Sequence, residues 1–235
     1  MNVILLESAD FVALDRVCLR GRRLLHIQTV HRAAVGDDLR VGVIGGKLGT
    51  GRVVRLEPDE VELTVALTLE PPHPLPLHLI LALPRPKVLN RTIAAAVSMG
   101  VREIDLINSW RVEKAYWNSP RLTPENLRDQ ALLGLEQSGD SMLPTIRLHR
   151  LFTPFLRERL PAISEDRLAL LADPGGVLPL PRGVEKAVVL AIGPEGGFIE
   201  GEIQAFQSAG FATVSLGPRI LRVETAIACL IGRLF

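Results

Sequence analysis

The sequence predicts an α/β protein in which a small β-rich domain precedes a mostly parallel sheet with helices on both faces. In the first 70 residues apolar and polar residues alternate, as in half-buried strands. From residue 77 onward, short and continuously apolar runs alternate with helical segments. Between these regions four prolines fall within six residues, which is typical of an extended linker. We therefore expect two domains, residues 1–70 and 77–235.

The clearest strands of the first domain are "DLRVGVI" and "VELTVAL", where every second residue is apolar. The turn "GGKLGTG" lies between them, and "EPDE" marks a second turn. "GGKLGTG" lacks the Gly-Lys-Ser/Thr ending of a phosphate-binding loop, and a strand rather than a helix follows it. The sequence therefore predicts a hairpin tip here.

In the second domain, apolar runs predict strands and amphipathic segments predict helices. Thr123 and Pro124 are a favourable N-cap and first residue for a helix that ends near Ser138. The last helix has an apolar stripe from Val223 to Leu234, typical of a core helix or of an interface with a second copy. The predicted strands are "LHLILAL", "EIDLIN", "RLALLAD", "AVVLAIG" and "FATVSLG", and the other helices are "KVLNRTIAAAVSMG", "IEGEIQAFQSAG" and "RVETAIACLIGRLF".

Composition excludes several classes of protein. The net charge is +1, so no overall field attracts nucleic acid or membranes. No apolar stretch approaches the roughly 20 residues of a membrane span, and no signal segment opens the chain, so we expect a cytoplasmic protein. Cys18 and Cys229 are expected to be free, buried thiols. The five histidines lack metal-ligand spacing, so no metal is expected.

Two glycine-bearing turns, "IGPEGGF" and "LGPRILRVETA", each follow a predicted strand. Ligands of open parallel sheets bind at the carboxyl ends of strands, where both turns lie. Neither turn matches a dinucleotide-binding or phosphate-binding pattern, and the Glu195 carboxylate would repel a phosphate. The turns therefore predict a ligand held by backbone groups and lacking a phosphate chain, such as S-adenosylmethionine.

Together, these two motifs resemble the bacterial ribosomal RNA small-subunit methyltransferase E family, uridine-N3 methyltransferases of the SPOUT class. "GLEQSGDSMLPTI" is similar to a helix-and-strand segment that precedes the motifs in that family. The resemblance implies methyl transfer from S-adenosylmethionine to N3 of a uridine in 16S ribosomal RNA. It also implies a PUA-like RNA-binding first domain, a homodimer, and a C-terminal trefoil knot around the cofactor.

Four positions depart from the family pattern. Ala95, Ser98, Asp140 and Met142 stand where the family often has charged residues, which removes positive charge near the expected RNA face. Two alternatives therefore stay open: an RNA-binding or ribosome-assembly protein with the same fold, and a methyltransferase acting on a different RNA site. A nucleotide-dependent enzyme is a third reading, disfavoured by the absent Lys-Ser/Thr.

For the cofactor and the reaction, the candidate residues lie in the two turns. Uracil N3 must lose its proton to attack a methyl group, and a nearby cation favours the resulting anion. Arg222 is the candidate cation, and Glu224 is expected to orient Arg222 or to serve the N-terminus of the last helix, with a general-base role as the alternative. Alternatively, Arg222 is a surface residue paired with Glu224 or Glu195. The candidate cofactor-binding residues are Ile192, Gly193, Pro194, Glu195, Gly196, Gly197, Leu216, Gly217, Leu221, Arg222 and Thr225.

RNA binding requires cations for the phosphates. Residues 16–32 contain five arginines and no acid, and "SWRVEKAYWNSP" interleaves aromatic residues with cations. Such a segment can stack bases or can pack a loop onto the core. The candidate RNA-binding residues are Arg20, Arg22, Arg23, Arg32, Arg111, Lys114 and Arg219.

Overall fold

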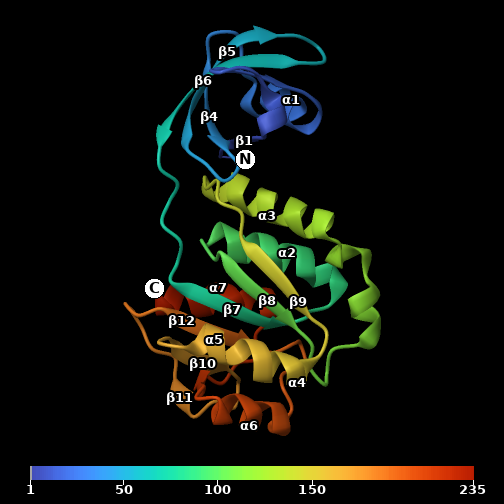
Figure 1. Ribbon diagram of the computed structural model, residues 1–235, viewed down its shortest axis with the longest axis vertical. Helices are drawn as coiled ribbons and strands as arrows, with labels where there is room; N and C mark the ends of the chain where they lie inside the picture. The colour runs from blue at the N-terminus through green and yellow to red at the C-terminus, as the bar shows by residue number, and fades with distance from the viewer. Residues whose placement is uncertain (1) are drawn as a thin grey trace. The chain divides into compact units, whose positions relative to one another are not determined.

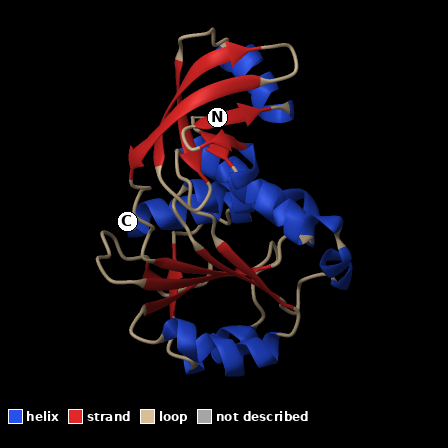
Figure 2. Cartoon of the chain, turned by 45° about the horizontal axis from the view of Figure 1, so that its top comes forward, coloured by secondary structure: helices blue, strands red, loops and turns tan. Residues whose placement is uncertain are grey.

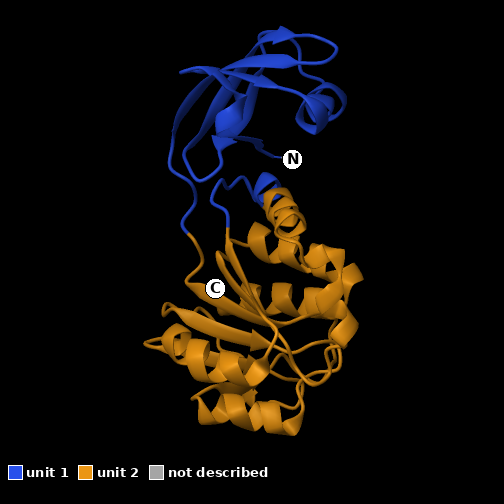
Figure 3. Ribbon diagram, turned by 45° about the vertical axis from the view of Figure 1, so that its right-hand side comes forward, with its two compact units in different colours: residues 1–73, 135–143 blue, residues 74–134, 144–235 orange. Residues whose placement is uncertain are grey.

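The structure, a computed structural model, describes residues 2–235, which divide into two compact units (Figure 3). Unit 1 comprises residues 1–73 and 135–143, and unit 2 comprises residues 74–134 and 144–235. The chain thus leaves unit 1, returns to it for the segment 135–143, and leaves it again.

Unit 1 is built on a six-stranded sheet in the order β1-β4-β5-β6-β3-β2. Only β1 and β4 pair in parallel; the other pairs are antiparallel. Its elements are β1 (Ile4–Leu6), η1 (Ser8–Asp10), β2 (Phe11–Ala13), β3 (Arg16–Leu19), α1 (Gly21–His26), η2 (Ile27–His31), β4 (Asp38–Val43), β5 (Leu48–Leu56) and β6 (Val61–Leu69).

The predicted alternation in unit 1 places its apolar residues in one core. Leu39 and Val41 of β4 pack with Val61 and Leu63 of β6, all four buried. The predicted hairpin tip is shorter than expected, because the second half of "GGKLGTG" already belongs to β5. Gly49 explains why: a Cβ there would lie 1.8 Å from the carbonyl oxygen of a residue in β6, so only glycine permits this strand approach.

Unit 2 contains a seven-stranded sheet in the order β11-β13-β10-β12-β7-β8-β9, and all its pairs are parallel. Every residue of β7 and β12 is buried, as expected of strands covered on both faces. The strands are β7 (Leu77–Ala82), β8 (Glu103–Ile107), β9 (Thr145–His149), β10 (Leu168–Ala172), β11 (Leu178–Pro179), β12 (Val188–Ile192) and β13 (Ala212–Ser215).

Helices cover both faces of this sheet (Figure 2). Helix α2 packs against α7 on one face, and α4, α5 and α6 lie on the other (Figure 1). The predicted fold class is therefore confirmed, although β9, β11 and the helical stretch 152–164 were not among the predicted strands and helices. The helices are α2 (Pro86–Ser98), η3 (Lys114–Asn118), η4 (Pro120–Leu122), α3 (Pro124–Ser138), α4 (Phe152–Pro154), η5 (Phe155–Arg159), α5 (Leu160–Ser164), α6 (Glu200–Ser208) and α7 (Val223–Leu234).

The apolar stripe of α7 fills the interior of its own chain. Val223, Ile227, Leu230, Ile231 and Leu234 are each at most 4% exposed. Of the two readings of this stripe, the structure selects the core helix, so the stripe gives no argument for a second copy.

A buried polar cluster joins three neighbouring strands of unit 2. The carboxylate of Asp105 on β8 is fully buried and lies 2.6 Å from His78 Nε2 on β7 and 2.7 Å from His149 Nε2 on β9. Burial by itself raises the pKa of Asp105, but the hydrogen bonds from both imidazoles outweigh it and leave the pKa below its ordinary value. The cluster therefore keeps a carboxylate ionised inside the sheet.

Three smaller expectations concern membranes, metals and thiols. None of the helices formed by residues 2–235 has the length and apolar character needed to cross a membrane. Over the same residues, no three His, Cys, Asp or Glu side chains gather as a metal ion would require. Both cysteines are free, but neither is buried as expected: Cys18 is half-buried and Cys229 is exposed.

Candidate functional site

A pocket opens in unit 2 at the carboxyl ends of β10, β12 and β13. Both glycine-bearing turns contribute to it, together with the residues that follow β10 and one side of α7. Its lining residues are Ala172, Asp173, Pro174, Ile192, Gly193, Pro194, Glu195, Gly197, Val214, Ser215, Leu216, Gly217, Arg219, Ile220, Leu221, Val223, Ala226 and Leu230. The chain thus forms a pocket where parallel sheets usually bind ligands.

The first turn, after β12, depends on two of its glycines. The Gly197 N–H donates to the Pro194 carbonyl over 2.8 Å, and Gly197 has a φ of +72°, a conformation that side chains other than glycine's rarely adopt. A Cβ on Gly193 would lie 3.1 Å from the Phe198 backbone nitrogen. This turn therefore folds back tightly on itself and exposes backbone groups to the pocket.

The second turn, after β13, leads into α7. Gly217 has a φ of +123°, and its N–H donates to Ser215 Oγ over 3.0 Å. Beyond it, Leu221, Val223 and Leu230 supply an apolar wall to the pocket. The pocket thus combines backbone polar groups on two sides with apolar side chains on a third.

Most of the predicted cofactor-binding residues lie together around this pocket. Gly196, Arg222 and Thr225 are the exceptions, since they do not line it. The sequence reading missed Asp173 and Pro174, which follow the third strand, β10. The strand "RLALLAD" was predicted, and because ligands bind at the carboxyl ends of strands, the residues that follow it could have been named as candidates. The predicted residues that do line the pocket are Ile192, Gly193, Pro194, Glu195, Gly197, Leu216, Gly217 and Leu221.

Arg222 is exposed and is the N-cap residue of α7, between two residues that line the pocket. Among residues 2–235 its guanidinium has no ion-pair partner. Glu224 Oε1 lies instead 3.6 Å from Arg91 Nη2 on α2, and Glu195 Oε1 accepts a hydrogen bond from the Arg85 backbone N–H over 3.0 Å. Within the described residues, Arg222 therefore forms an ion pair with neither Glu224 nor Glu195, unlike the alternative in which it is a paired surface residue.

The aromatic segment after β8 both packs on the core and reaches solvent. Trp117 is buried, its Nε1 donates to Asn108 Oδ1 over 2.9 Å, and the Arg150 guanidinium lies 5.7 Å from its ring centroid. Trp110 is 79% exposed. The Arg111 guanidinium donates to the carbonyl of Gly196, so the segment is joined to the first glycine-bearing turn.

Acids from elsewhere in unit 1 neutralise much of the basic stretch between residues 16 and 32. Arg20 pairs with Glu60, Arg22 with Glu136 and Arg23 with Asp10, at 2.5, 2.6 and 2.5 Å. The absence of acids from the sequence between residues 16 and 32 therefore did not mean that these arginines are unpaired. Folding brings carboxylates from distant parts of the sequence to them.

Arg32 differs from the other predicted arginines of unit 1. It is exposed and, within the described residues, has no ion-pair partner. The same holds for Arg40 and Arg52 on the paired strands β4 and β5, which the sequence reading did not single out. Both arginines stand at polar positions of strands with alternating apolar and polar residues, and this placement could have identified them as exposed cations.

One departure from the family pattern has a structural explanation. Asp140 is 4% exposed, and its Oδ1 accepts hydrogen bonds from the backbone N–H groups of Ser141 and Met142 over 2.7 and 3.0 Å. The carboxylate therefore stabilises the turn after α3.

Comparison with known proteins places the chain in a family. Residues 71–234 match the model of the RNA methyltransferase domain family. The ribosomal RNA small subunit methyltransferase E of Treponema pallidum is 31% identical over 235 residues, covering 97% of this chain and 88% of that protein.

Solved structures agree with this match. The ribosomal RNA small subunit methyltransferase E of Neisseria gonorrhoeae, bound to S-adenosyl methionine, is 26% identical with a TM-score of 0.76, covering 98% of this chain and 95% of that one. A putative methyltransferase of Legionella pneumophila, 24% identical with a TM-score of 0.74 and coverages of 98% and 95%, shows the same fold. The chain, with its two glycine-bearing turns around one pocket, belongs to the ribosomal RNA small subunit methyltransferase E family.

Proposed function

We propose that this protein transfers a methyl group from S-adenosylmethionine to N3 of a uridine in small-subunit ribosomal RNA. The observation that carries the proposal is the pocket formed by both glycine-bearing turns at the carboxyl ends of β10, β12 and β13. Support comes from the family and from the similar Neisseria protein, whose structure holds S-adenosyl methionine.

The residues of the pocket fit this cofactor. Backbone groups of Gly193 and Gly217 can bind an adenine or amino-acid group, and the apolar wall of α7 can cover the adenosine. The Asp173 and Glu195 carboxylates favour the positive sulfonium and ammonium groups. Arg219 is the one cation that lines the pocket in the described chain, too few for a phosphate chain.

When bound, S-adenosylmethionine supplies a methyl group on a positively charged sulfur. The protein's task is to align the uracil N3 with that methyl group and to favour the deprotonated imide. Arg222 is suited to this because its exposed guanidinium is not neutralised by an acid of the described chain and its neighbours Leu221 and Val223 line the pocket. The negative charge of Glu224, in the first turn of α7, interacts favourably with the positive N-terminal end of the helix dipole.

The assembly implied by the family resemblance is part of the proposal. Unit 1 would bind RNA as a PUA-like domain, two copies would form a homodimer, and the C-terminal elements would be knotted around the cofactor. Ile220 lines the pocket and is 82% exposed, which leaves apolar surface at the pocket rim for a second copy to cover. A cytoplasmic location also stays a prediction.

Mass mapping of small-subunit ribosomal RNA tests the function directly. RNA from cells that contain the protein should carry a methyl group on a uridine N3 that is absent from cells lacking it. A methyl group at another position would replace the N3 assignment with a different RNA site. Unchanged RNA, together with RNA binding, would favour the ribosome-assembly alternative.

A further inference from the structure

The loop between β8 and α3 presents one aromatic ring to solvent beside the cofactor-site turn. It carries both tryptophans and the only tyrosine of the chain. Trp117 is buried and its indole N–H donates to Asn108 within unit 2. Trp110, in contrast, is 79% exposed and forms no aromatic contact with the described residues. An exposed tryptophan loses the free energy that burial of its large apolar ring would give, so its position calls for a partner.

The backbone that carries Trp110 is held on both sides. Its N–H donates over 2.7 Å to Oε1 of Glu202, a buried carboxylate whose Oε2 accepts the Ile199 N–H over 3.0 Å at the start of α6. The next side chain, Arg111, donates to the Gly196 carbonyl, and the Val112 N–H donates to Ser109 O over 3.1 Å. The ring is therefore presented on a fixed backbone, which lowers the entropy cost of binding a ligand to it.

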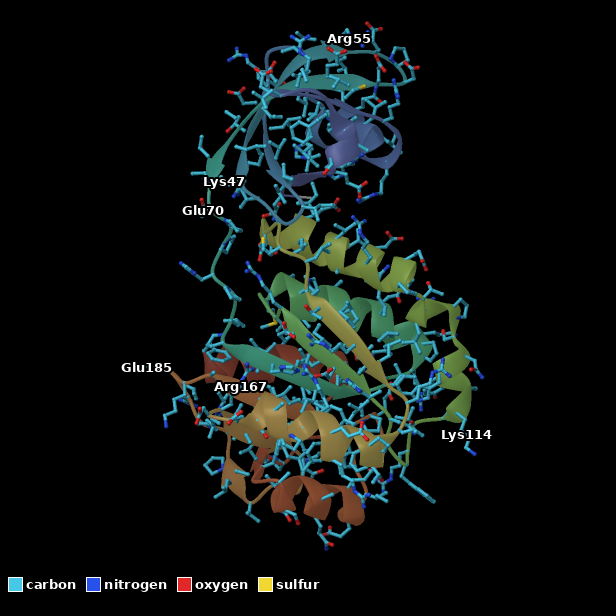
Figure 4. All side chains as sticks on the ribbon, in the orientation of Figure 1. Lys47, Arg55, Glu70, Lys114, Arg167 and Glu185 are labelled. Carbon is cyan, nitrogen blue, oxygen red and sulfur yellow. The ribbon has the colours of Figure 1, made fainter. Side chains whose placement is uncertain are left out.

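Cations that no acid neutralises accompany the exposed ring. Arg111, Lys114 and Arg121 are exposed, and within residues 2–235 none of them has an ion-pair partner. The Lys114 side chain extends away from the surface (Figure 4). The nearby carboxylate of Glu113 accepts a hydrogen bond from Tyr116 Oη over 2.8 Å. In contrast with the paired arginines of unit 1, this loop keeps free positive charge for phosphates.

We propose that Trp110 is a stacking platform for an RNA base next to the target uridine. This inference rests on the proposed function and names a substrate-positioning residue for the same site. Trp110 does not line the pocket, but its loop contacts the turn that does, so it would stack on a neighbour of the reacting base. Arg111, the next residue, and the other cations of the loop bind nearby phosphates, while the indole binds the π face that every base offers.

Steady-state methylation of small ribosomal subunits from cells lacking the protein tests the platform. Trp110→Ala should raise KM by about 5- to 100-fold, the range for loss of one base–aromatic stack, with kcat and cofactor affinity within about twofold. Trp110→Phe should keep most of the affinity because it retains a π face. Trp110→Leu should not, because it is apolar but lacks one. Leu133→Ala, an exposed apolar residue on α3, is the matched control and should change nothing.

Three results would overturn the inference. One is an equal KM for Trp110→Leu and Trp110→Phe, which would indicate simple apolar contact. Another is a fall in molecular mass for Trp110→Ala, which would assign the ring to an interface with a second copy. The third is unchanged KM for Trp110→Ala.

Fluorescence separates this inference from the proposed function. With a short oligouridylate as probe, tryptophan emission of the wild-type protein should be quenched, and Trp110→Phe should lose that quenching because only buried Trp117 then emits. Quenching without N3 methylation would contradict the proposed function but keep the platform. Methylation with equal quenching in both proteins would contradict the platform alone.

Discussion

Arg222 is exposed and lies between two residues that line the pocket, and its loss should lower the methylation rate more than cofactor binding. Arg222→Ala should lower the single-turnover methylation rate by about 10²–10³, the range for loss of one electrostatic stabiliser. Cofactor affinity should hardly change, because we expect backbone groups of the two turns to supply most of its polar contacts. Arg222→Lys should recover only part of the rate, since a point charge does not reproduce a planar guanidinium.

The pH dependence of the same variant tests the reason. Raising the pH should partly rescue Arg222→Ala, because more uracil ionises without help. Arg91→Ala is a useful control, as it removes the partner of Glu224 at an exposed site and should leave the rate unchanged. A loss of rate that follows lost cofactor binding or a lower melting temperature would assign Arg222 to structure.

Replacing Asp105 tests how much the buried polar cluster stabilises the fold, and replacing the neighbouring Glu103 is the matched control. Asp105→Ala removes the common partner of two histidines inside the sheet and should lower the free energy of unfolding by about 3–5 kcal/mol. Glu103→Ala, on the same strand and face, breaks a part-exposed pair with Arg147 and should cost less than about 1 kcal/mol. Urea unfolding at neutral pH measures both, and equal losses would contradict the assignment.

The stability contribution of Asp105 should depend on acid pH in one direction. Its pKa in the folded protein is lowered, so the unfolded chain binds a proton first as the pH falls. The contribution is fully present above the unfolded pKa of about 3.9 and is lost as the pH falls from there through the folded value. The difference in stability between wild type and Asp105→Ala should therefore shrink as the pH falls below about pH 4. A difference that grows in acid would contradict this.

At the scale of elements, the turn after β12 has little room for a side chain at its first glycine. Gly193→Ala places a Cβ 3.1 Å from the Phe198 nitrogen and 3.2 Å from Gly197, and both are backbone atoms of the same turn. The turn must open, so cofactor affinity measured by calorimetry should fall at least about tenfold, while the melting temperature should change little. Gly201→Ala on α6 meets nothing within 4 Å and should leave affinity unchanged. Unaltered binding by Gly193→Ala would show that the turn's shape is not required.

The elements show where sequence patterns inform and where they stop. Buried strands such as β7 and β12 were predicted because continuous apolar runs carry their own signal. The pocket turns were predicted because glycine and proline mark them directly. The ion pairs of Arg20 and Arg23 were not predicted, because Glu60 and Asp10 come close to these arginines only in the folded chain. The two-residue strand β11 is too short to show a period.

At the scale of the whole molecule, we expect a homodimer at micromolar concentration. The family resemblance motivates this, and the exposed apolar Ile220 at the pocket rim agrees with a covered surface there. Light scattering of the full chain should give twice the 25.7 kDa of one copy. Ile220→Glu should shift the mass toward the monomer, because a buried unpaired charge is costly. A monomeric wild type would remove the dimer from the proposal.

Cofactor binding should reside in the second domain alone. The lining residues of the pocket, from Ala172 to Leu230, all belong to unit 2, so the fragment 77–235 should bind S-adenosylmethionine. Calorimetry should give an affinity near that of the full chain, and preferential binding of ATP or NAD would contradict the cofactor. The fragment should melt at a lower temperature, because Leu135 and Glu136, each 1% exposed in the full chain, lose the rest of unit 1.

The return of residues 135–143 to unit 1 has a consequence for the order of events during synthesis. Ser141 Oγ donates to the Gly46 carbonyl, and the Glu136 carbonyl accepts the Asn2 N–H over 2.7 Å, so the residue before β1 and the turn between β4 and β5 bond to residues made much later. A ribosome adds about 5–20 residues per second, which leaves unit 1 incomplete for seconds after residue 73 has emerged. All six strands of the unit 1 sheet are made before this segment, so the sheet lacks these two bonds until residues 135–143 arrive, when residues 74–134 of unit 2 have also been made.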